Sequence, residues 1–175
     1  MLDIYAQYIE TTITFETVLP SEEEFSKRIE TISAEYPWIV WEENGRVQGY
    51  AYAHRLHERA AYQWDAELSA YLDRDCVARG MGKRMLLTLF DILRLQHIHT
   101  VYSLVTSPNE RSEHMHQSLG FRHIGTHRNT GYKNGRWTDV NWYDLSIMDY
   151  EAEPAPFIGI GEVSPDKLAD ILKRG

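Results

Sequence analysis

The order of apolar and polar positions along the chain predicts a mixed α/β fold. Short apolar or alternating runs at 38–41, 47–54, 66–72 and 101–105 indicate strands, because strand side chains change face at every residue. Asn44-Gly45 predicts a tight turn between the first two strands, and Asn134-Gly135 predicts another between longer runs at 124–132 and 137–147. Helical spacing predicts helices over 2–9, 21–32, 83–93 and 112–119. We therefore expect a mostly antiparallel central sheet flanked by helices.

The most informative segment joins the strand at 66–72 to the helix at 83–93 through a glycine turn, Arg79-Gly80-Met81-Gly82. Glycine lets the backbone approach a ligand closely, and the first N–H groups of a helix have no acceptors within the helix. The turn therefore predicts a phosphate site, with positive charge beside it from Arg79 and Lys83. Upstream of it, the two-residue period places the side chains of Glu67, Ser69 and Tyr71 on one face of the strand.

Two common nucleotide-binding motifs do not fit this turn. It lacks the Gly-x-Gly-x-x-Gly spacing of dinucleotide folds. It also lacks the Gly-Lys-Ser/Thr ending of a P-loop, because Gly82 is followed by Lys83-Arg84. The dinucleotide fold and the P-loop are left as minor alternatives. A third alternative is a tight turn that binds no ligand.

Composition and charge narrow the class further. The length of 175 residues and the 43% hydrophobic content predict one globular domain. A formal net charge of −8 argues against nonspecific binding to nucleic acid, and no apolar run reaches the length of a membrane span. The single cysteine, Cys76, excludes an internal disulfide and, with no signal peptide evident, predicts a cytoplasmic protein.

Other catalytic chemistries have weak support in the sequence. Cys76 has no histidine nearby in the sequence, which argues against a nucleophilic role. The eight histidines include pairs at two-residue spacing, His97 with His99 and His114 with His116, but no set of cysteines accompanies them. We therefore expect no metal site.

Several segments in order carry a resemblance to a known family. The glycine turn and the later segments Ser107 to Ser112, Met115-His116 and Leu119-Gly120-Phe121 resemble the two acyl-coenzyme-A-binding motifs of the GCN5-related N-acetyltransferases (GNAT). Within that superfamily, the chain is most similar to the phosphinothricin and methionine sulfoximine N-acetyltransferases. The matching segments are Tyr8 to Thr12, Thr14 to Thr17, Tyr36-Pro37-Trp38, Gly49 to Ala53, Arg59 to Tyr62 and Gly131 to Trp137.

This resemblance implies acetyl-CoA as cosubstrate and a small amino-acid-like amine as acceptor. It also implies a homodimer. It implies that backbone N–H groups from Val77 to Gly82 hold the pyrophosphate and that Asn109 binds the pantetheine arm. The full set of cofactor-binding residues that it predicts is Leu72, Val77, Ala78, Arg79, Gly80, Met81, Gly82, Lys83, Asn109 and Ser112. An Asx turn after Pro108 is the alternative for Asn109.

The resemblance also assigns catalytic and substrate-binding roles. Glu67 falls at the position of the general base that deprotonates the acceptor amine, which is almost wholly protonated at pH 7. His116 is a secondary candidate for the acid that protonates the departing thiol, with a structural role as its alternative. The predicted substrate contacts are Phe15, Arg59, Tyr62, Tyr71 and Trp137; a surface arginine and core aromatic residues are the alternatives.

The chain departs from the family pattern in its chemistry and at its ends. Val77 stands where the family commonly has Arg or Gln, which predicts weaker cofactor binding, and Thr138 replaces a histidine of the close phosphinothricin enzymes.

We expect the N-acetyltransferase domain over 1–150 without the usual first strand and the start of the first helix. Residues 151–175 are expected to form an extension with a strand at 157–163 and a helix after Ser164-Pro165. We hypothesise that this extension replaces the missing front end; a peripheral helix is the alternative.

Two other functions stay open at this point. The first is acetylation of a protein N-terminus or of a polyamine, which requires an open acceptor groove. The second is an acyl-CoA-binding module with little catalysis, which Val77 and the missing first strand favour.

Overall fold

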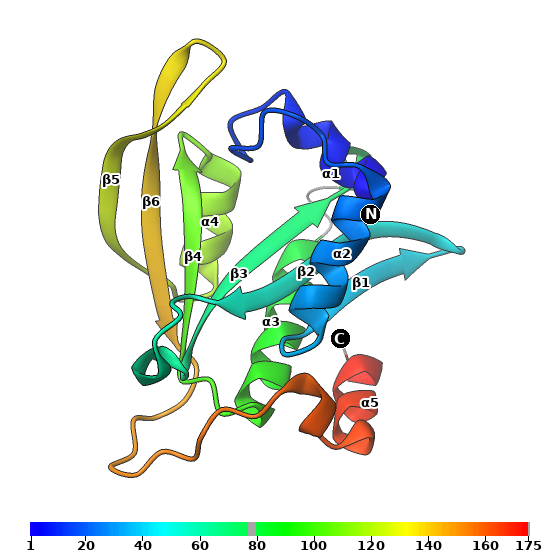
Figure 1. Ribbon diagram of the computed structural model, residues 1–175, viewed down its shortest axis with the longest axis vertical. Helices are drawn as coiled ribbons and strands as arrows, with labels where there is room; N and C mark the ends of the chain where they lie inside the picture. The colour runs from blue at the N-terminus through cyan, green and yellow to red at the C-terminus, as the bar shows by residue number, and fades with distance from the viewer. Residues whose placement is uncertain (77–79, 175) are drawn as a thin grey trace.

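The computed structural model describes residues 1–76 and 80–174, and it contains one six-stranded sheet with helices on both faces (Figure 1). The strands are β1 (Trp38–Glu43), β2 (Arg46–Arg55), β3 (Asp65–Leu72), β4 (Thr100–Ser107), β5 (Arg122–Lys133) and β6 (Arg136–Ser146), in the spatial order β1-β2-β3-β4-β6-β5. All neighbouring pairs are antiparallel except β3 with β4. The expected mixed, mostly antiparallel sheet is confirmed.

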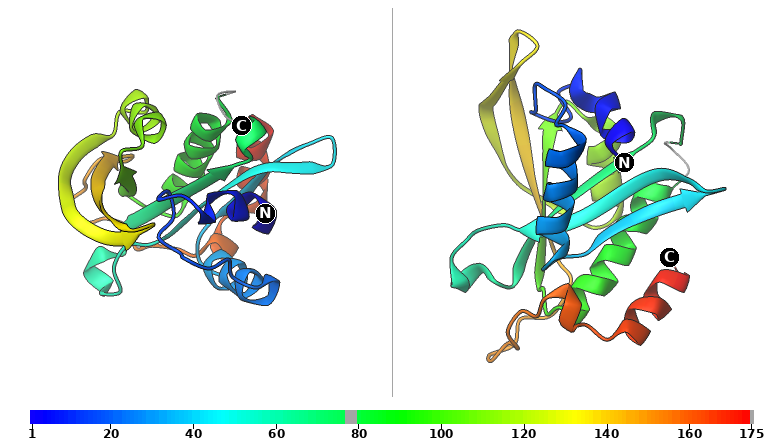
Figure 2. Two further views of the ribbon diagram at one scale, coloured as in Figure 1. Left: turned by 90° about the horizontal axis from the view of Figure 1, so that it is seen from above. Right: turned by 45° about the vertical axis from the view of Figure 1, so that its right-hand side comes forward.

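Helices cover both faces of this sheet. One face carries α1 (Leu2–Ile9) and α2 (Glu22–Ser33), and the other carries α3 (Met81–Leu95) and α4 (Glu110–Ser118) (Figure 2). The main core lies under α3, where Leu89 and Leu93 are fully buried against β2, β3 and β4. A second, aromatic core lies under α1 and α2, where Phe25 and Tyr50 meet. The sheet therefore separates two packed layers.

Local signals explain where several elements begin and end. Ser21 and Glu24 form a reciprocal capping box at the start of α2, because each side chain bonds to the backbone N–H of the other. Asn44 and Asn134 have φ values of 53° and 52° in the two hairpin turns, a left-handed conformation that asparagine tolerates. Gly120, with φ of 90°, follows the end of α4 as expected.

The C-terminal extension differs from its expected form. Residues 157–163 are not a strand; they contain a single 3-10 turn at Ile160–Glu162, followed by α5 (Pro165–Arg174). The prediction of a strand was wrong, because the apolar residues of this segment pack against side chains instead of a neighbouring strand: Phe157 stacks on Tyr36 at 5.0 Å between ring centroids. Within the described residues, nothing pairs with the outer edge of β1.

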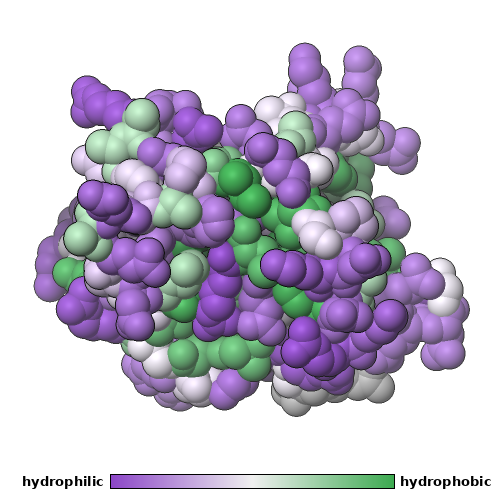
Figure 3. Space-filling model, turned by 90° about the horizontal axis from the view of Figure 1, so that it is seen from below, coloured by the Kyte–Doolittle hydropathy of each residue, from purple (hydrophilic) through white to green (hydrophobic). Residues whose placement is uncertain are grey.

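The extension instead runs across the lower end of the domain, and α5 packs beside α3 (Figure 1). The side chain of Gln96 is fully buried, and its Nε2 donates to Glu35 O at 2.7 Å and to Ile158 O at 2.9 Å. Seen from below, hydrophobic side chains reach the surface near the middle of this end, with hydrophilic side chains around them (Figure 3). The extension is therefore packed into the fold at this end, and the front-end replacement within one chain is not what the structure shows.

Removal of residues 154–175 is expected to lower the melting temperature by roughly 10 °C. The deletion exposes the sites that bury Val163 and Ile171, and each buried aliphatic side chain contributes about 1.5–3 kcal/mol. It also leaves the buried amide of Gln96 without one of its two acceptors. Differential scanning calorimetry of the two chains measures this. An unchanged melting temperature contradicts a structural role for the extension.

None of the helices in residues 1–76 and 80–174 has the length and apolar character needed to cross a bilayer.

Candidate active site

The site begins where two parallel strands separate. β3 and β4 pair only at their first residues, from Asp65 with Thr100 to Glu67 with Tyr102. Beyond that point β3 continues to pair with β2 as far as Leu72, and β4 continues to pair with β6 as far as Ser107. The backbone groups of 68–71 that would meet β4 therefore face an open cleft, where they can bond to an extended ligand, whereas Leu72 O already accepts from the hydroxyl of Tyr8.

Two adjoining cavities fill this cleft, with volumes of about 90 and 160 Å³. They share five lining residues: Ile13, Ala70, Asn109, Ser112 and Met115. The first cavity runs between the strands and is also lined by Ser69, Tyr71, Thr106 and His116. The second leads toward the N-terminus of α3 and is also lined by Leu72, Gly82 and Arg111. Together they form one groove from the strand junction to the helix end.

The N-terminus of α3 closes the outer end of this groove. Gly80 precedes the helix with φ of 77°, and as a glycine it has no side chain to cap the helix. Among residues 1–76 and 80–174, no side chain accepts from the first N–H groups of α3, and with the helix dipole these groups attract an anion. Gly82 keeps the groove open, because a Cβ built there would lie 3.1 Å from Met115 Sδ and 3.4 Å from Leu72 Cδ1. An uncapped helix end beside a glycine-lined groove fits a pyrophosphate with an extended arm.

The predicted cofactor contacts are only partly brought together. Gly80, Gly82, Leu72, Asn109 and Ser112 lie along the groove or at its end. Met81 is buried in the core, so it can contribute only its backbone. The ammonium of Lys83 donates to Ser118 O at 3.0 Å, at the end of α4, and not toward the groove. The predictions for Val77, Ala78 and Arg79 lie outside the described residues.

Asn109 has a structural role at the start of α4 and also faces the groove. Its Oδ1 accepts from Ser112 N at 3.4 Å, so the side chain caps α4. Glu113 in turn accepts from the Asn109 backbone N–H at 3.4 Å. The side chain nevertheless lines both cavities. A structural role for Asn109 is therefore present as a helix cap, and ligand binding stays a prediction.

Glu67 lies at the closed end of the cleft, because it is the last residue of β3 that pairs with β4. It stands opposite His54 of β2, whose Nε2 is 3.7 Å from Glu67 Oε1. Burial raises the pKa of the Glu67 carboxyl, and His54 and His57 oppose this rise. A carboxylate with a raised pKa is a better proton acceptor than an exposed one. The next residues, Leu68 and Ser69, line the cavity.

His116 enters the cleft from α4 as a neutral ring. Only 4% of it is exposed, and its Nδ1 donates to Ser112 O at 2.7 Å, which places a proton on that nitrogen. The ring stacks on Tyr143 at 5.7 Å between centroids. Burial lowers the pKa of the imidazole, because the charged form loses solvent. At neutral pH its Nε2 therefore carries a lone pair. This nitrogen can accept a proton, but it has no proton to donate.

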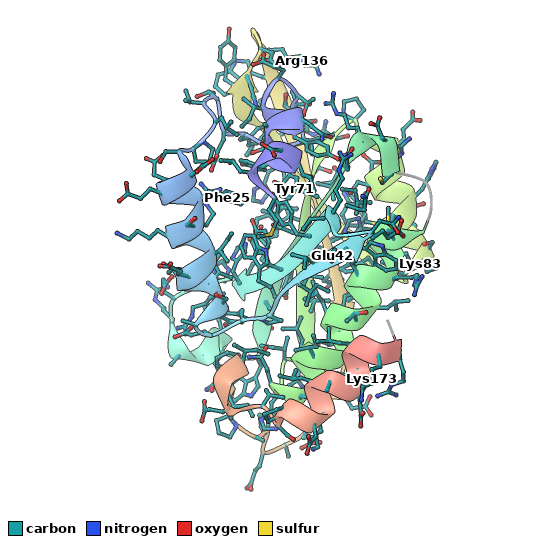
Figure 4. The ribbon with its side chains drawn as sticks, turned by 90° about the vertical axis from the view of Figure 1, so that its right-hand side faces the viewer. Phe25, Glu42, Tyr71, Lys83, Arg136 and Lys173 are labelled. Carbon is teal, nitrogen blue, oxygen red and sulfur yellow. The ribbon has the colours of Figure 1, made fainter. Side chains whose placement is uncertain are left out.

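The predicted substrate contacts are distributed over three places. Tyr71 lines the cleft and lies under α1 (Figure 4), where its ring meets Tyr5 edge-on at 5.0 Å. Arg59 and Tyr62 are exposed in the β2–β3 connection, at the lower end of the sheet (Figure 1). Phe15 and Trp137 belong to the upper end, and Trp137 is 61% exposed beside Tyr132. The structure does not bring these five residues into one pocket.

The loop between α1 and α2 is fixed to the tip of the β5–β6 hairpin. Lys133 is 4% exposed, and its ammonium donates to Thr14 O at 2.7 Å and to Glu16 O at 2.6 Å. The ring of Phe15 lies over Gly131, where a Cβ would come within 2.3 Å of it. Ile13 of the same loop lines both cavities. Lys133 therefore positions one wall of the cleft.

Lys133→Met is expected to lower the free energy of unfolding by about 1–3 kcal/mol, because two buried carbonyls lose their donor. The Michaelis constant for the cosubstrate should rise as Ile13, which lines both cavities of the groove, loses its support. Urea unfolding and steady-state kinetics measure the two effects. Lys27→Met, at an exposed position of α2, is the matched control and should change neither. Equal stability of the two variants contradicts the positioning role.

Sequence reasoning missed several groups in the cleft. His54 reaches Glu67 only through the register of β2 with β3, which no local motif encodes. Arg111 lines the outer cavity and is the second residue after Asn109, so the same segment that predicted Asn109 contains its signal. Ser69 was placed on the face of Glu67 and Tyr71 without a role, and it lines the inner cavity.

Comparisons with known proteins agree with this geometry. Residues 1–142 match the family model of the acetyltransferase (GNAT) domain. The chain is 35% identical over 155 residues to the phosphinothricin N-acetyltransferase of Streptomyces viridochromogenes, covering 88% of this chain and 82% of that protein. It is 32% identical over 120 residues to the L-methionine sulfoximine/L-methionine sulfone acetyltransferase of Salmonella typhimurium, covering 69% and 70%.

A solved structure is similar over nearly the whole chain. It is the phosphinothricin acetyltransferase of Sinorhizobium meliloti in complex with acetyl-CoA, with a TM-score of 0.84 and 31% identity. The match covers 94% of this chain and 89% of that one. The fold expected from the sequence is therefore the fold of that enzyme.

Proposed function

The chain belongs to the acetyltransferase (GNAT) family and is an N-acetyltransferase, and on that premise we propose that it transfers the acetyl group of acetyl-CoA to the amine of a small amino-acid-like molecule. The observation that carries this proposal is the groove between β3 and β4, which ends at the uncapped N-terminus of α3. The names of the relatives, which describe phosphinothricin and methionine sulfoximine acetyltransferases, support the substrate class.

The residues of this chain would hold the cosubstrate along the groove. The backbone groups of 68–71 along the cleft would face an extended arm, and the first N–H groups of α3 would face its pyrophosphate. When bound, acetyl-CoA supplies an activated acetyl thioester. Arg111 at the outer cavity contributes positive charge in the part of the site that Lys83 does not reach.

Glu67 is the proposed general base. Its side chain lies just before the residues that line the cavity, so water carries the proton between the acceptor amine and the carboxylate. His54, whose Nε2 is 3.7 Å from Glu67 Oε1, opposes the rise of the Glu67 pKa that burial causes and so favours the ionised carboxylate. The deprotonated amine would then attack the thioester carbonyl directly, without a covalent acyl-enzyme. The C–N bond forms as the C–S bond breaks, and coenzyme A leaves as a thiolate that the second amine proton neutralises.

His116→Asn tests the acid role expected for this histidine. The asparagine Nδ2–H can replace the bond from Nδ1 to Ser112 O, so the fold is retained. Because burial lowers the pKa of His116 and its ring is neutral at pH 7 and above, we expect kcat to fall by less than about tenfold. Steady-state kinetics at pH 7 and pH 9 measures this. A loss of about 100-fold or more, together with loss of an alkaline limb in the pH profile, supports proton donation by His116.

The experiment that tests the function is release of coenzyme A thiol by the purified protein against a panel of amines. The panel contains methionine sulfoximine, methionine sulfone, phosphinothricin, a diamine and a peptide with a free N-terminus. Turnover with one of the first three supports the proposal. Turnover confined to the peptide or the diamine supports the alternative acceptors, and acetyl-CoA binding without turnover supports the binding-module alternative. Thr138, in place of a histidine of the phosphinothricin enzymes, makes us expect little turnover of phosphinothricin itself.

Two further parts of the proposal concern the protein in the cell. We infer a homodimer from the family resemblance, with a second copy completing the acceptor site. Size-exclusion chromatography with light scattering measures the oligomeric state.

We also infer a cytoplasmic location from the family and from the free thiol of Cys76, which is buried.

A further inference from the structure

A second cavity lies at the lower end of the sheet, where β3 begins. Its volume is about 180 Å³, and its lining includes Trp64, Asp65, His99, Tyr150 and Glu151. None of its described lining residues also lines the groove between β3 and β4. The cavity is therefore distinct from the acetyl-transfer site.

Asp65 brings an uncompensated carboxylate into this cavity. The side chain is partly buried, and among the described residues it has no hydrogen bond or ion pair. Burial raises the pKa of its carboxyl, and the charges of His57 and His99 oppose the rise. A desolvated carboxylate without a partner is unfavourable, so a cation placed against it gains free energy.

His99 is a second polar group in the wall without a partner. Only 4% of the residue is exposed, and its Nδ1 is buried with no hydrogen bond to any described residue. The backbone N–H of His99 donates to Trp64 O at 2.8 Å, which fixes the turn that brings the ring here. Buried polar atoms of this kind are rare in folded proteins, and they indicate a place where a ligand or water completes the bonding.

Two aromatic rings form the other walls, and both are held in place. Trp64 Nε1 donates to Ala155 O at 2.8 Å. The hydroxyl of Tyr150 bonds to Thr100 Oγ1 at 2.8 Å and to Ser146 Oγ at 2.9 Å, although 71% of the residue is exposed. Aromatic faces carry negative charge density and attract cations. Glu151 adds a second carboxylate to the same cavity.

We propose that this cavity binds a small organic cation, a primary ammonium on a short apolar or aromatic group, with the ammonium against Asp65 and the apolar part against Trp64 and Tyr150. The combination of one unpaired carboxylate with aromatic walls selects a cation over an anion or a neutral molecule. It also excludes a bulky ligand, because the volume accommodates only a small group.

Isothermal titration calorimetry with benzylammonium and with benzyl alcohol tests this site on the whole chain. We expect benzylammonium to bind at one site and benzyl alcohol to bind about tenfold more weakly or not at all. Asp65→Asn, which is nearly isosteric, should weaken benzylammonium binding by about tenfold or more without lowering the melting temperature. Asp149→Asn, at an exposed position nearby, is the matched control and should leave binding unchanged.

The outcomes that overturn the proposal are separate from those that test acetyl transfer. Equal binding of the alcohol and the ammonium, or no binding, contradicts a cation site. Loss of binding in Glu67→Gln but not in Asp65→Asn places the amine in the acetyl-transfer site and also contradicts it. Loss of binding in Asp65→Asn alone supports the site whether or not the protein has turned over any acceptor.

The bound ammonium has two sources, which kinetics distinguishes. Asp65 and Glu67 lie two residues apart on one face of β3, which is a separation of about 7 Å along the strand. The ammonium is thus either the far end of a diamine acceptor or a separate monoamine. If it is the far end, 1,5-diaminopentane has a lower Michaelis constant than pentylamine, and Asp65→Asn removes the difference. If the monoamine is separate, the two constants are equal while benzylammonium still binds.

Discussion

Glu67→Gln is expected to lower kcat by about two to four orders of magnitude, the range that positioned general bases contribute. The substitution keeps the shape of the side chain and removes its ability to accept a proton. Because Glu67 lies outside the residues that line the groove, the affinity for acetyl-CoA should not change. Steady-state kinetics with the best acceptor and calorimetric titration of acetyl-CoA separate the two quantities.

The pH profile gives an independent test of the same role. The acceptor must lose a proton to the carboxylate, so only ionised Glu67 is active. The wild-type kcat should therefore fall as the pH decreases through the raised pKa of Glu67, which lies above that of an exposed glutamate. In Glu67→Gln this acidic limb should disappear.

Glu42→Gln is the matched control, because Glu42 is an exposed strand glutamate on β1 and lines neither cavity of the groove. It should retain the wild-type kcat and pH profile. A Glu67→Gln enzyme with less than a tenfold loss and an intact acidic limb contradicts the assignment of Glu67 as the base.

The elements of this fold were predictable because their signals are local. Ser21 and Glu24 are three residues apart, as a capping box requires, and Asn44-Gly45 and Asn134-Gly135 encode their turns within two residues. The face of β3 that carries Glu67 and Tyr71 follows from the two-residue period alone. These choices need no knowledge of what packs against them.

Site residues were predictable only where they belong to a segment that resembles the family or to a local motif. The separation of β3 from β4 that opens the groove depends on the pairing of both strands with other neighbours, which no segment encodes by itself. His54 and Glu67 are 13 positions apart in sequence and meet through strand register. Because α4 packs beside α3, the ammonium of Lys83 bonds to Ser118 O. Its charge therefore does not lie beside the predicted phosphate site.

The segment 157–163 shows the opposite error, a local pattern without the partner it requires. Its apolar residues alternate as in a strand, but a strand is stable only beside another one. Here Ile158 exchanges a bond with Gln96, and Ile160 N donates to Glu35 O at 2.9 Å, so the backbone bonds to a turn and a helix end instead. The apolar pattern therefore predicted a strand that this segment does not form, because its backbone has no neighbouring strand to pair with.

Gly82→Val is expected to weaken acetyl-CoA binding by about 5- to 150-fold, which corresponds to the cost of about 1–3 kcal/mol for overfilling a packed space. A Cβ at this position lies 3.1 Å from Met115 Sδ and 3.4 Å from Leu72 Cδ1, and the two γ-methyl groups extend further into the groove between them. Met115 is flexible and can yield, but it lines both cavities, so its displacement narrows the groove rather than relieving it.

The matched control for this effect is Gly125→Val in β5, where a built Cβ meets nothing within 4 Å and the backbone is not left-handed. Valine is favourable in a strand, so this variant should keep both its melting temperature and its affinity for acetyl-CoA. Calorimetric titration of the two variants, with the acceptor absent, isolates cosubstrate binding from catalysis. Wild-type affinity in Gly82→Val means that the cosubstrate does not pass between Leu72 and Met115, and the path proposed for it along the outer cavity is then wrong.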